Sequence, residues 1–139
     1  MHTVLILMLV ACGASSTEPT AGTEGAAAAA APGAGTRSDV ALDEFVEAHG
    51  QGAVVLDVRT EGEFAAGHVP GATNKPLGSF GPDDPWLAGL DKEAPLYVIC
   101  HSGGRSARAA DTLAAAGFNA VNVLGGTGGW QAAGHPVEK

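Results

Sequence analysis

One cysteine, Cys100, lies in a sequence context that favours a reactive thiol. Residues 98–106 read Val-Ile-Cys-His-Ser-Gly-Gly-Arg-Ser, so an apolar run ends at Cys100 and a glycine-containing loop leads into a predicted helix. Successive amides of such a loop can turn inward, and the helix N-terminus adds about half a positive charge. Both effects favour a thiolate and can lower a cysteine pKa from about 8.5 to about 7 or below. We therefore predict that Cys100 is a nucleophile.

The loop residues after the cysteine suggest what it would bind. Gly103 and Gly104 can adopt backbone angles closed to other residues and leave the sulfur approachable. Arg105 brings a permanent cation that could hold an anionic substrate. A buried structural cysteine at a strand end is the competing interpretation, and Cys100 alone would favour it. The Gly-Gly-Arg-Ser segment that opens the helix favours a functional loop.

Alternating strands and helices are expected to position this loop. Short, apolar runs rich in β-branched residues predict strands over 53–58, 96–99 and 120–124, with a further extended piece over 72–77. Helical spacing and start signals predict helices over 42–49, 61–66 and 106–116. They also predict a helix that begins at Pro85 and a last short helix around Trp130. This alternation predicts an α/β fold with a central, mostly parallel sheet and helices on both faces. Ligands bind at the carboxyl ends of such strands, where Cys100 lies.

Composition limits the partners of the chain. It has 139 residues, and about 100 remain after the N-terminal segment, enough for one domain with a modest core. All seven Lys and Arg lie at or after Arg37, as do thirteen of the fifteen acidic residues, so the folded part has a net charge of about −6. Phosphate backbones are repelled by that charge, and we expect no nucleic-acid partner. No spacing of residues predicts a metal site.

The N-terminus has the features of an export signal. Residues 4–10 form an apolar run of seven, which suits a signal peptide and is far short of the roughly 20 residues that span a bilayer. Leu9-Val10-Ala11-Cys12 resembles the lipobox of bacterial lipoproteins, although no Lys or Arg precedes it. That resemblance implies cleavage before Cys12 and lipidation of its sulfur. A signal cleaved after Ala14 and a wrongly assigned start codon are the alternatives.

The segment after Cys12 is suited to a tether. Residues 13–36 are low-complexity and almost free of large apolar groups, so they cannot bury enough surface to fold. We therefore divide the chain into a signal peptide (1–11), a lipidated cysteine with linker (12–36) and a domain (37–139). Resemblance to lipoproteins, with Gly13 after the cysteine, implies a periplasmic protein anchored to the outer rather than the inner membrane. A disulfide between Cys12 and Cys100 would join a tether to a strand end and is not expected.

Four motifs in order carry a resemblance to one family. They are the loop 100–106, Leu-Asp-Val-Arg at 56–59 with Glu63-Phe64, Gly-His-Val-Pro-Gly-Ala at 67–72, and Gly-Gly at 125–126 with Gly129-Trp130 and 134–137. Together they resemble the single-domain rhodaneses and cover about residues 38–137. The resemblance implies a rhodanese-like fold and a sulfurtransferase in which Cys100 becomes a persulfide. No cofactor is implied.

The resemblance also assigns roles to the residues around the cysteine. The backbone amides of His101, Ser102, Gly103, Gly104 and Arg105 would cradle the outer sulfur, and Arg105 would help bind anions. Asp57 would face the loop or, equally, accept hydrogen bonds from turn amides. Arg59 and Glu63 are expected to pair with each other, while His68, Trp130 and His135 are interpreted as framework.

The expected reaction moves sulfur from thiosulfate or a persulfide to a thiol or cyanide acceptor, by a two-step transfer. Related cysteine phosphatases and arsenate reductases have five residues between Cys and Arg, whereas four intervene here, so the smaller ring favours sulfur. His101 and Ser102 add no permanent cation, which makes thiosulfate itself a weak candidate donor. A non-catalytic persulfide-binding or docking module is the alternative, and a thioredoxin-like function lacks a resolving cysteine. We expect a monomer that contacts a membrane only through its lipid.

Overall fold

Strands and helices alternate along residues 35–139, the part of the chain that the computed structural model describes. The elements are, in order, β1 (Thr36–Val40), α1 (Leu42–Gly50), β2 (Val54–Asp57), α2 (Glu61–Ala66), β3 (Thr73–Asn74), the 3-10 turn η1 (Leu87–Gly89), β4 (Pro95–Ile99), α3 (Gly104–Ala115), β5 (Asn119–Val123) and α4 (Gly126–Ala132). The predicted signal peptide, Cys12 and nearly all of the predicted linker lie outside the described residues.

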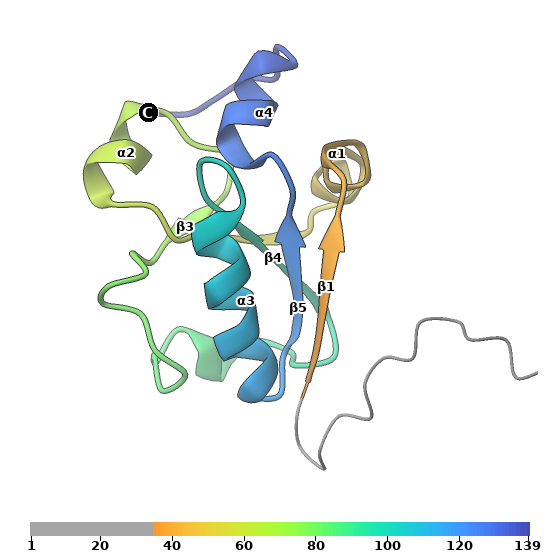
Figure 1. Ribbon diagram of the computed structural model, residues 1–139, viewed down its shortest axis with the longest axis vertical. Coiled ribbons are helices and arrows are strands. Elements are labelled where there is room, and N and C mark those ends of the chain that lie inside the picture. The colour runs from red at the N-terminus through yellow and green to blue at the C-terminus, as the bar shows by residue number, and fades with distance from the viewer. Residues whose placement is uncertain (1–34) are drawn as a thin grey trace, which may run out of the picture.

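The five strands form one parallel sheet in the order β1-β5-β4-β2-β3. This confirms the predicted α/β fold. Register brings the last residues of neighbouring strands side by side, with Asp57 opposite Ile99 and Val98 opposite Asn122. In Figure 1, β1 and β5 point toward α4, so the carboxyl ends of the strands lie at the end of the sheet that carries α2 and α4.

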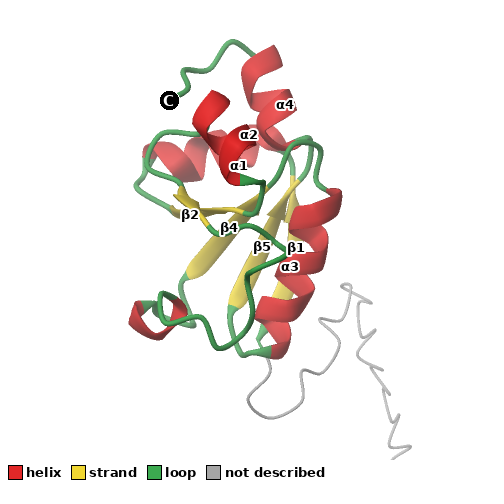
Figure 2. Cartoon of the chain, turned by 90° about the vertical axis from the view of Figure 1, so that its left-hand side faces the viewer, coloured by secondary structure: helices red, strands yellow, loops and turns green. Residues whose placement is uncertain are grey.

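Helices pack on both faces of the sheet, as predicted, and each face has its own core. On one face Leu56 and Val98 pack with Ala109 and Leu113 of α3. On the other face Val55 and Ile99 pack with Phe45 of α1 and with Trp130 of α4. Each fully buried side chain of this size contributes about 1.5–3 kcal/mol. Figure 2 shows α3 running beside the strands and α4 beyond their ends.

The edge strand β1 was not predicted from the sequence. Its residues, Thr-Arg-Ser-Asp-Val, are mostly polar and exposed, and Thr36 falls within the segment interpreted as linker. The strand forms because its backbone pairs with β5 from Thr36–Asn119 to Val40–Val123. Backbone pairing at a sheet edge needs no apolar face, so the hydrophobic pattern gives no signal there.

The segment after Asp84 also differs from the prediction. The Asp84 carboxylate accepts a hydrogen bond from the Trp86 amide at 2.9 Å, as a capping residue would. Only a single 3-10 turn follows, because Gly89 disfavours a longer helix and the apolar side chains already reach the core on the α3 face. None of the helices within residues 35–139 is both long and apolar enough to span a bilayer.

Candidate active site

A short loop joins the carboxyl end of β4 to the start of α3, and Cys100 is its first residue. Cys100 is a free cysteine and is 1% exposed, so its sulfur lies at the floor of the loop. The Gly103 amide donates a hydrogen bond to Cys100 Sγ at 3.1 Å. Gly103 has a φ of +107°, a left-handed conformation that a side chain would strain. The loop therefore turns at least one amide inward onto the sulfur.

Ser106, on the first turn of α3, places a hydroxyl beside the same sulfur. Its Oγ lies 3.4 Å from Cys100 Sγ and 2.6 Å from the Asn122 side-chain oxygen. Asn122, on β5, donates in turn to the Asp39 carboxylate of β1 at 2.8 Å. Sequence reasoning missed this network, since nothing in the sequence indicates that positions on β1, β5 and α3 meet.

These contacts decide the ionisation of the cysteine. Burial by itself raises the pKa of the Cys100 thiol. Hydrogen bonds from the Ser106 hydroxyl and amide and from the Gly103 and Ser102 amides act in the opposite direction and prevail, so the pKa is lowered from its ordinary value. A lowered pKa makes more thiolate available near neutral pH, as a nucleophile requires.

The first turn of α4 holds the loop from the far side. The Thr127 amide donates to the Cys100 carbonyl oxygen at 2.8 Å, and the Gly128 amide donates to that of His101 at 3.0 Å. A side chain at Gly126 would collide with the Cys100 carbonyl oxygen. The close approach explains why a glycine is needed there. With these two carbonyls turned toward α4, the amides that follow are free to face the sulfur.

Asp57 takes part in the structural support at the end of β2. It is fully buried at the end of β2, where its carboxylate accepts hydrogen bonds from the Arg59 amide at 3.0 Å and from the Arg59 guanidinium at 2.8 Å. Arg59 also donates to the carbonyl oxygen of Gly67 at 2.8 Å. Of the two roles considered for Asp57, the structure therefore favours hydrogen bonding to a turn amide.

The predicted pairing of Arg59 with Glu63 is wrong. Glu63 forms two hydrogen bonds of 2.7 Å with the guanidinium of Arg105, from α2 to α3. It also completes a capping box with Thr60 at the start of α2. Arg59 turns inward instead, because a buried arginine needs the buried carboxylate of Asp57. The signature of the capping box, Thr followed three residues later by Glu, is visible in the sequence and could have placed Glu63 at this helix start.

The Glu63–Arg105 ion pair alters both partners. Hydrogen bonding from Arg105, followed by that from the Thr60 amide, holds the pKa of Glu63 well below its ordinary value. The same hydrogen bond raises the pKa of Arg105. Both side chains remain more than a third exposed. The guanidinium predicted to bind anions is thus already engaged by a carboxylate.

The remaining predicted residues lie where the loop meets solvent or within the framework. His101, Ser102 and Gly104 are exposed on the loop. His68 stacks on Phe64 with ring centroids 3.6 Å apart, and the Trp130 indole donates to the Pro136 carbonyl oxygen at 2.7 Å. These contacts fit the framework role predicted for His68 and Trp130. Within residues 35–139, no group of three or more His, Cys, Asp and Glu side chains could hold a metal ion.

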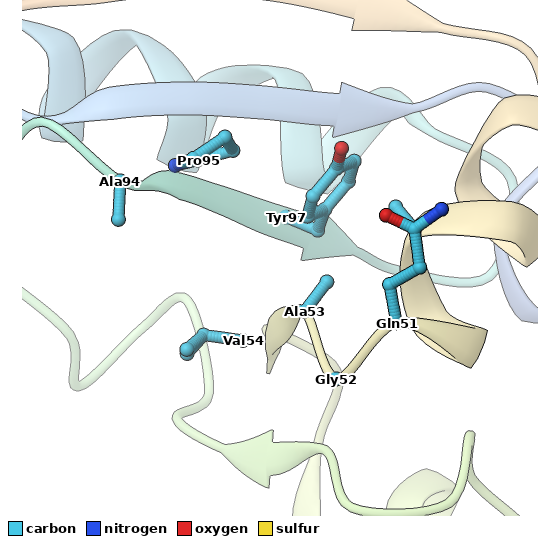
Figure 3. A pocket seen from close by; sticks show the side chains of 8 residues that line it. Gln51, Gly52, Ala53, Val54, Ala94, Pro95 and Tyr97 are labelled. Atoms are coloured by element: carbon cyan, nitrogen blue, oxygen red, sulfur yellow. The ribbon is translucent and has the colours of Figure 1, made fainter.

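A cleft of about 410 Å³ opens beside the loop. It is lined by Arg59, Glu63, Ala66, Gly67, His101 and Gln131. A second hollow, of about 280 Å³, lies at the amino ends of β2 and β4, between the turn after α1 and Pro95 (Figure 3). Its lining includes Val54 and Tyr97 but no cysteine, histidine or charged side chain. Of the two, the first includes a residue of the loop, His101, which is next to Cys100 in the chain.

Comparison with known proteins gives consistent matches. The rhodanese-like domain family matches residues 41–133. The putative sulfur carrier protein YrkF of Bacillus subtilis is 39% identical over 77 residues, which are 55% of this chain but only 40% of that protein. The thiosulfate sulfurtransferase GlpE of Pseudomonas putida is 39% identical over 89 residues, 63% of this chain and 77% of the relative. A solved structure of a rhodanese-related protein from Thermoplasma volcanium has a TM-score of 0.64 at 31% identity, covering 73% of this chain and 97% of that one.

Proposed function

Because this chain belongs to the rhodanese-like domain family, we propose that it is a sulfurtransferase that carries a sulfane sulfur on Cys100. The observation that supports this most directly is the surroundings of the Cys100 sulfur. It sits at the carboxyl end of a central strand, within hydrogen-bonding distance of the Gly103 amide and the Ser106 hydroxyl. Relatives that match this chain over 77% and 83% of their own length are named thiosulfate sulfurtransferases.

In the first step the Cys100 thiolate attacks the outer sulfur of a donor. A new sulfur–sulfur bond forms to Cys100 while the sulfur–sulfur bond of the donor breaks, and the bonding pair leaves with sulfite from thiosulfate or with a thiolate from an organic persulfide. The Gly103 amide faces the sulfur before the reaction begins, so it stabilises negative charge there without rearranging. The Ser106 hydroxyl adds to this when its single proton turns from the Asn122 oxygen to the sulfur.

In the second step a thiol or cyanide acceptor attacks the outer sulfur of the Cys100 persulfide. The bond between the two sulfurs breaks, the electron pair returns to Cys100, and the thiolate is regenerated. No net oxidation or reduction of the protein occurs over the cycle, and no group other than the protein's own side chains and amides is required. Such a two-step transfer gives ping-pong kinetics.

The geometry of the loop favours a sulfur atom over a phosphoryl group. Four residues separate Cys100 from Arg105, and the sulfur is almost completely buried. A single protruding sulfur can reach such a floor, whereas a tetrahedral group needs a wider ring with several amides around it. This argues against phosphatase or arsenate reductase activity.

A non-catalytic module that binds persulfide or docks a partner is the second candidate. The two candidates differ in whether sulfur turns over. Intact mass spectrometry after incubation with a donor should show one added sulfur atom, and cyanide should remove it with formation of thiocyanate. Cys100→Ser should gain no sulfur while keeping its far-ultraviolet circular dichroism. Persistent transfer in that variant would exclude Cys100 as the carrier, and a stable adduct that no acceptor removes would favour the module.

We also propose that Cys12 carries a lipid that anchors a monomeric domain to the periplasmic face of a bacterial outer membrane. The support is the sequence pattern Leu-Val-Ala-Cys and the low-complexity segment after it. Cys12→Ser should leave an unlipidated precursor and remove the protein from the membrane fraction. Fractionation that is unchanged by this substitution would contradict the anchor.

A further inference from the structure

The charges around the loop differ from those expected of a thiosulfate site. Thiosulfate carries two negative charges and must approach a thiolate that carries a third. A free cation beside the sulfur would offset this repulsion. The loop contributes one arginine, Arg105, and the adjoining cleft contributes one more, Arg59.

Both of these arginines are already paired. Arg59 binds Asp57 through two of its nitrogens and gives a further hydrogen bond to Gly67, and it is 4% exposed. Arg105 binds Glu63 through two nitrogens at 2.7 Å. Arg108, the next cation along α3, lies one helical turn further from the loop. The thiolate therefore has one compensated ion pair at the mouth of the loop, Glu63–Arg105, and a second, buried one nearby, Asp57–Arg59.

The cleft has room for a larger donor. Its volume of about 410 Å³ falls in the range of about 300–1,000 Å³ that is typical of sites for small organic molecules. Thiosulfate, with five heavy atoms, would leave most of it filled with water. Its lining mixes polar groups, from His101 and Gln131, with the small surfaces of Ala66 and Gly67. An amino-acid or short-peptide body fits such a lining.

We propose that Glu63 determines donor specificity: by holding Arg105, it leaves the loop without a free cation, so Cys100 takes sulfur from a low-molecular-weight organic persulfide in preference to thiosulfate. An organic persulfide carries at most one negative charge at its reacting sulfur, and its body occupies the cleft. Glu63 acts through Arg105 and is a positioning residue. The inference rests on the proposed sulfurtransferase function.

Glu63→Gln is the informative substitution because it changes charge with little change in shape. A glutamine oxygen can still accept the hydrogen bond from the Thr60 amide at the start of α2, so the helix cap is kept. The negative charge that compensates Arg105 is lost, together with the contact at Oε1, so the guanidinium keeps at most one hydrogen bond to residue 63 and carries an uncompensated positive charge that an anion can meet. Glu61→Gln is the matched control, since Glu61 lies on the same helix and its exposed side chain has no ion pair or hydrogen bond among residues 35–139.

The experiment measures kcat and KM with two donors, thiosulfate and glutathione persulfide, and with cyanide as acceptor. In Glu63→Gln we expect kcat/KM for thiosulfate to rise, mainly through a lower KM, so that its ratio to kcat/KM for glutathione persulfide increases about tenfold. Glu61→Gln should change neither value. A double variant, Glu63→Gln with Arg105→Gln, should lose the gain with thiosulfate, because the freed cation is its source.

Three results would overturn the proposal. They are an unchanged or lower kcat/KM for thiosulfate in Glu63→Gln, an equal gain in Glu61→Gln, and a gain that survives in the double variant. Failure of the proposed function looks different, because the wild-type protein would then transfer sulfur from neither donor.

A second measurement needs no turnover. Titration of the Cys100 thiolate by its ultraviolet absorbance should show a lower pKa in Glu63→Gln than in the wild type, and no change in Glu61→Gln. An unchanged pKa in Glu63→Gln would show that Glu63 does not offset the charge of Arg105 at the sulfur.

Discussion

Two ion pairs lie beside the active loop, and they differ in almost every physical respect. Asp57 and Arg59 are two residues apart in sequence, buried at 0% and 5% side-chain exposure, and joined by hydrogen bonds down to 2.8 Å. Glu63 and Arg105 are 42 residues apart, come from different helices, and are more than a third exposed. The first pair closes a turn, and the second crosses the mouth of the loop.

The difference shows why one pair supports the fold and the other can tune chemistry. Removing one partner of a buried pair leaves an uncompensated charge in a low-dielectric interior. Removing one partner of an exposed pair leaves a charge that water solvates at little cost. Substitutions in the exposed pair can therefore alter specificity with little loss of stability, whereas substitutions in the buried pair destabilise the fold.

The largest effect is expected from breaking the buried pair. Arg59→Leu leaves the Asp57 carboxylate buried without its partner, and the free energy of unfolding should fall by about 3–5 kcal/mol. Urea denaturation followed by circular dichroism measures this loss. Arg108→Leu, an exposed arginine on α3 without an ion pair among residues 35–139, is the control and should change stability by less than about 0.5 kcal/mol. A loss below about 1 kcal/mol in Arg59→Leu would mean that water reaches Asp57.

Ser106→Ala tests a residue that belongs to both the fold and the chemistry. It leaves the buried Asn122 oxygen without its 2.6 Å donor, which should cost about 1–3 kcal/mol of stability. The hydroxyl has a single proton, so the substitution also removes the hydrogen bond that this proton can donate to the Cys100 thiolate in place of Asn122, a contact that lowers the pKa of Cys100. The thiolate should then form at higher pH, and the acid limb of the pH–rate profile should move upward. An unmoved limb would show that the backbone amides alone set that pKa.

The exposed pair should be nearly neutral for stability. Arg105→Gln is expected to lower the free energy of unfolding by less than about 1 kcal/mol, because both partners are well solvated and screened by salt. Urea denaturation at low and at high salt measures the loss of unfolding free energy and its dependence on salt. A loss as large as that of Arg59→Leu would contradict the conclusion that the exposed pair contributes much less to stability than the buried pair.

The smallest effect is expected in acid. The pKa of Glu63 is lowered in the folded state, so its contribution to stability is fully present above its unfolded value of about 4.5 and is lost as the pH falls further. Because the group is exposed, the contribution is at most a few tenths of a kcal/mol. Glu63→Gln should therefore lower stability by this small amount near neutrality and have less effect as the pH falls below 4.5, so that the stability profile is slightly flatter there. Comparison with Glu61→Gln isolates the effect.

Much of the fold could be predicted because its signals are local. The buried strands β2, β4 and β5 appear as short apolar runs, and α2 and α3 begin and end within two residues of the predicted bounds. Cys100 could be singled out for the same reason, since a strand end, glycines and a helix start are contiguous in the chain. The exposed edge strand β1 was not predicted, because its polar residues contribute backbone pairing rather than buried side chains.

Some features of the site were beyond a sequence reading. The sequence by itself determined the order of strands and helices, the position of the nucleophile at the carboxyl end of β4, and the number of residues in its loop, because each depends on neighbours in the chain. Which carboxylate each arginine meets, and that Ser106 and Asn122 lie together beneath the sulfur, was decided only when α2, α3 and β5 packed on the sheet. The partners of charged and polar side chains depend on burial and on distances in the folded structure, and spacing along the chain predicts neither of these two quantities.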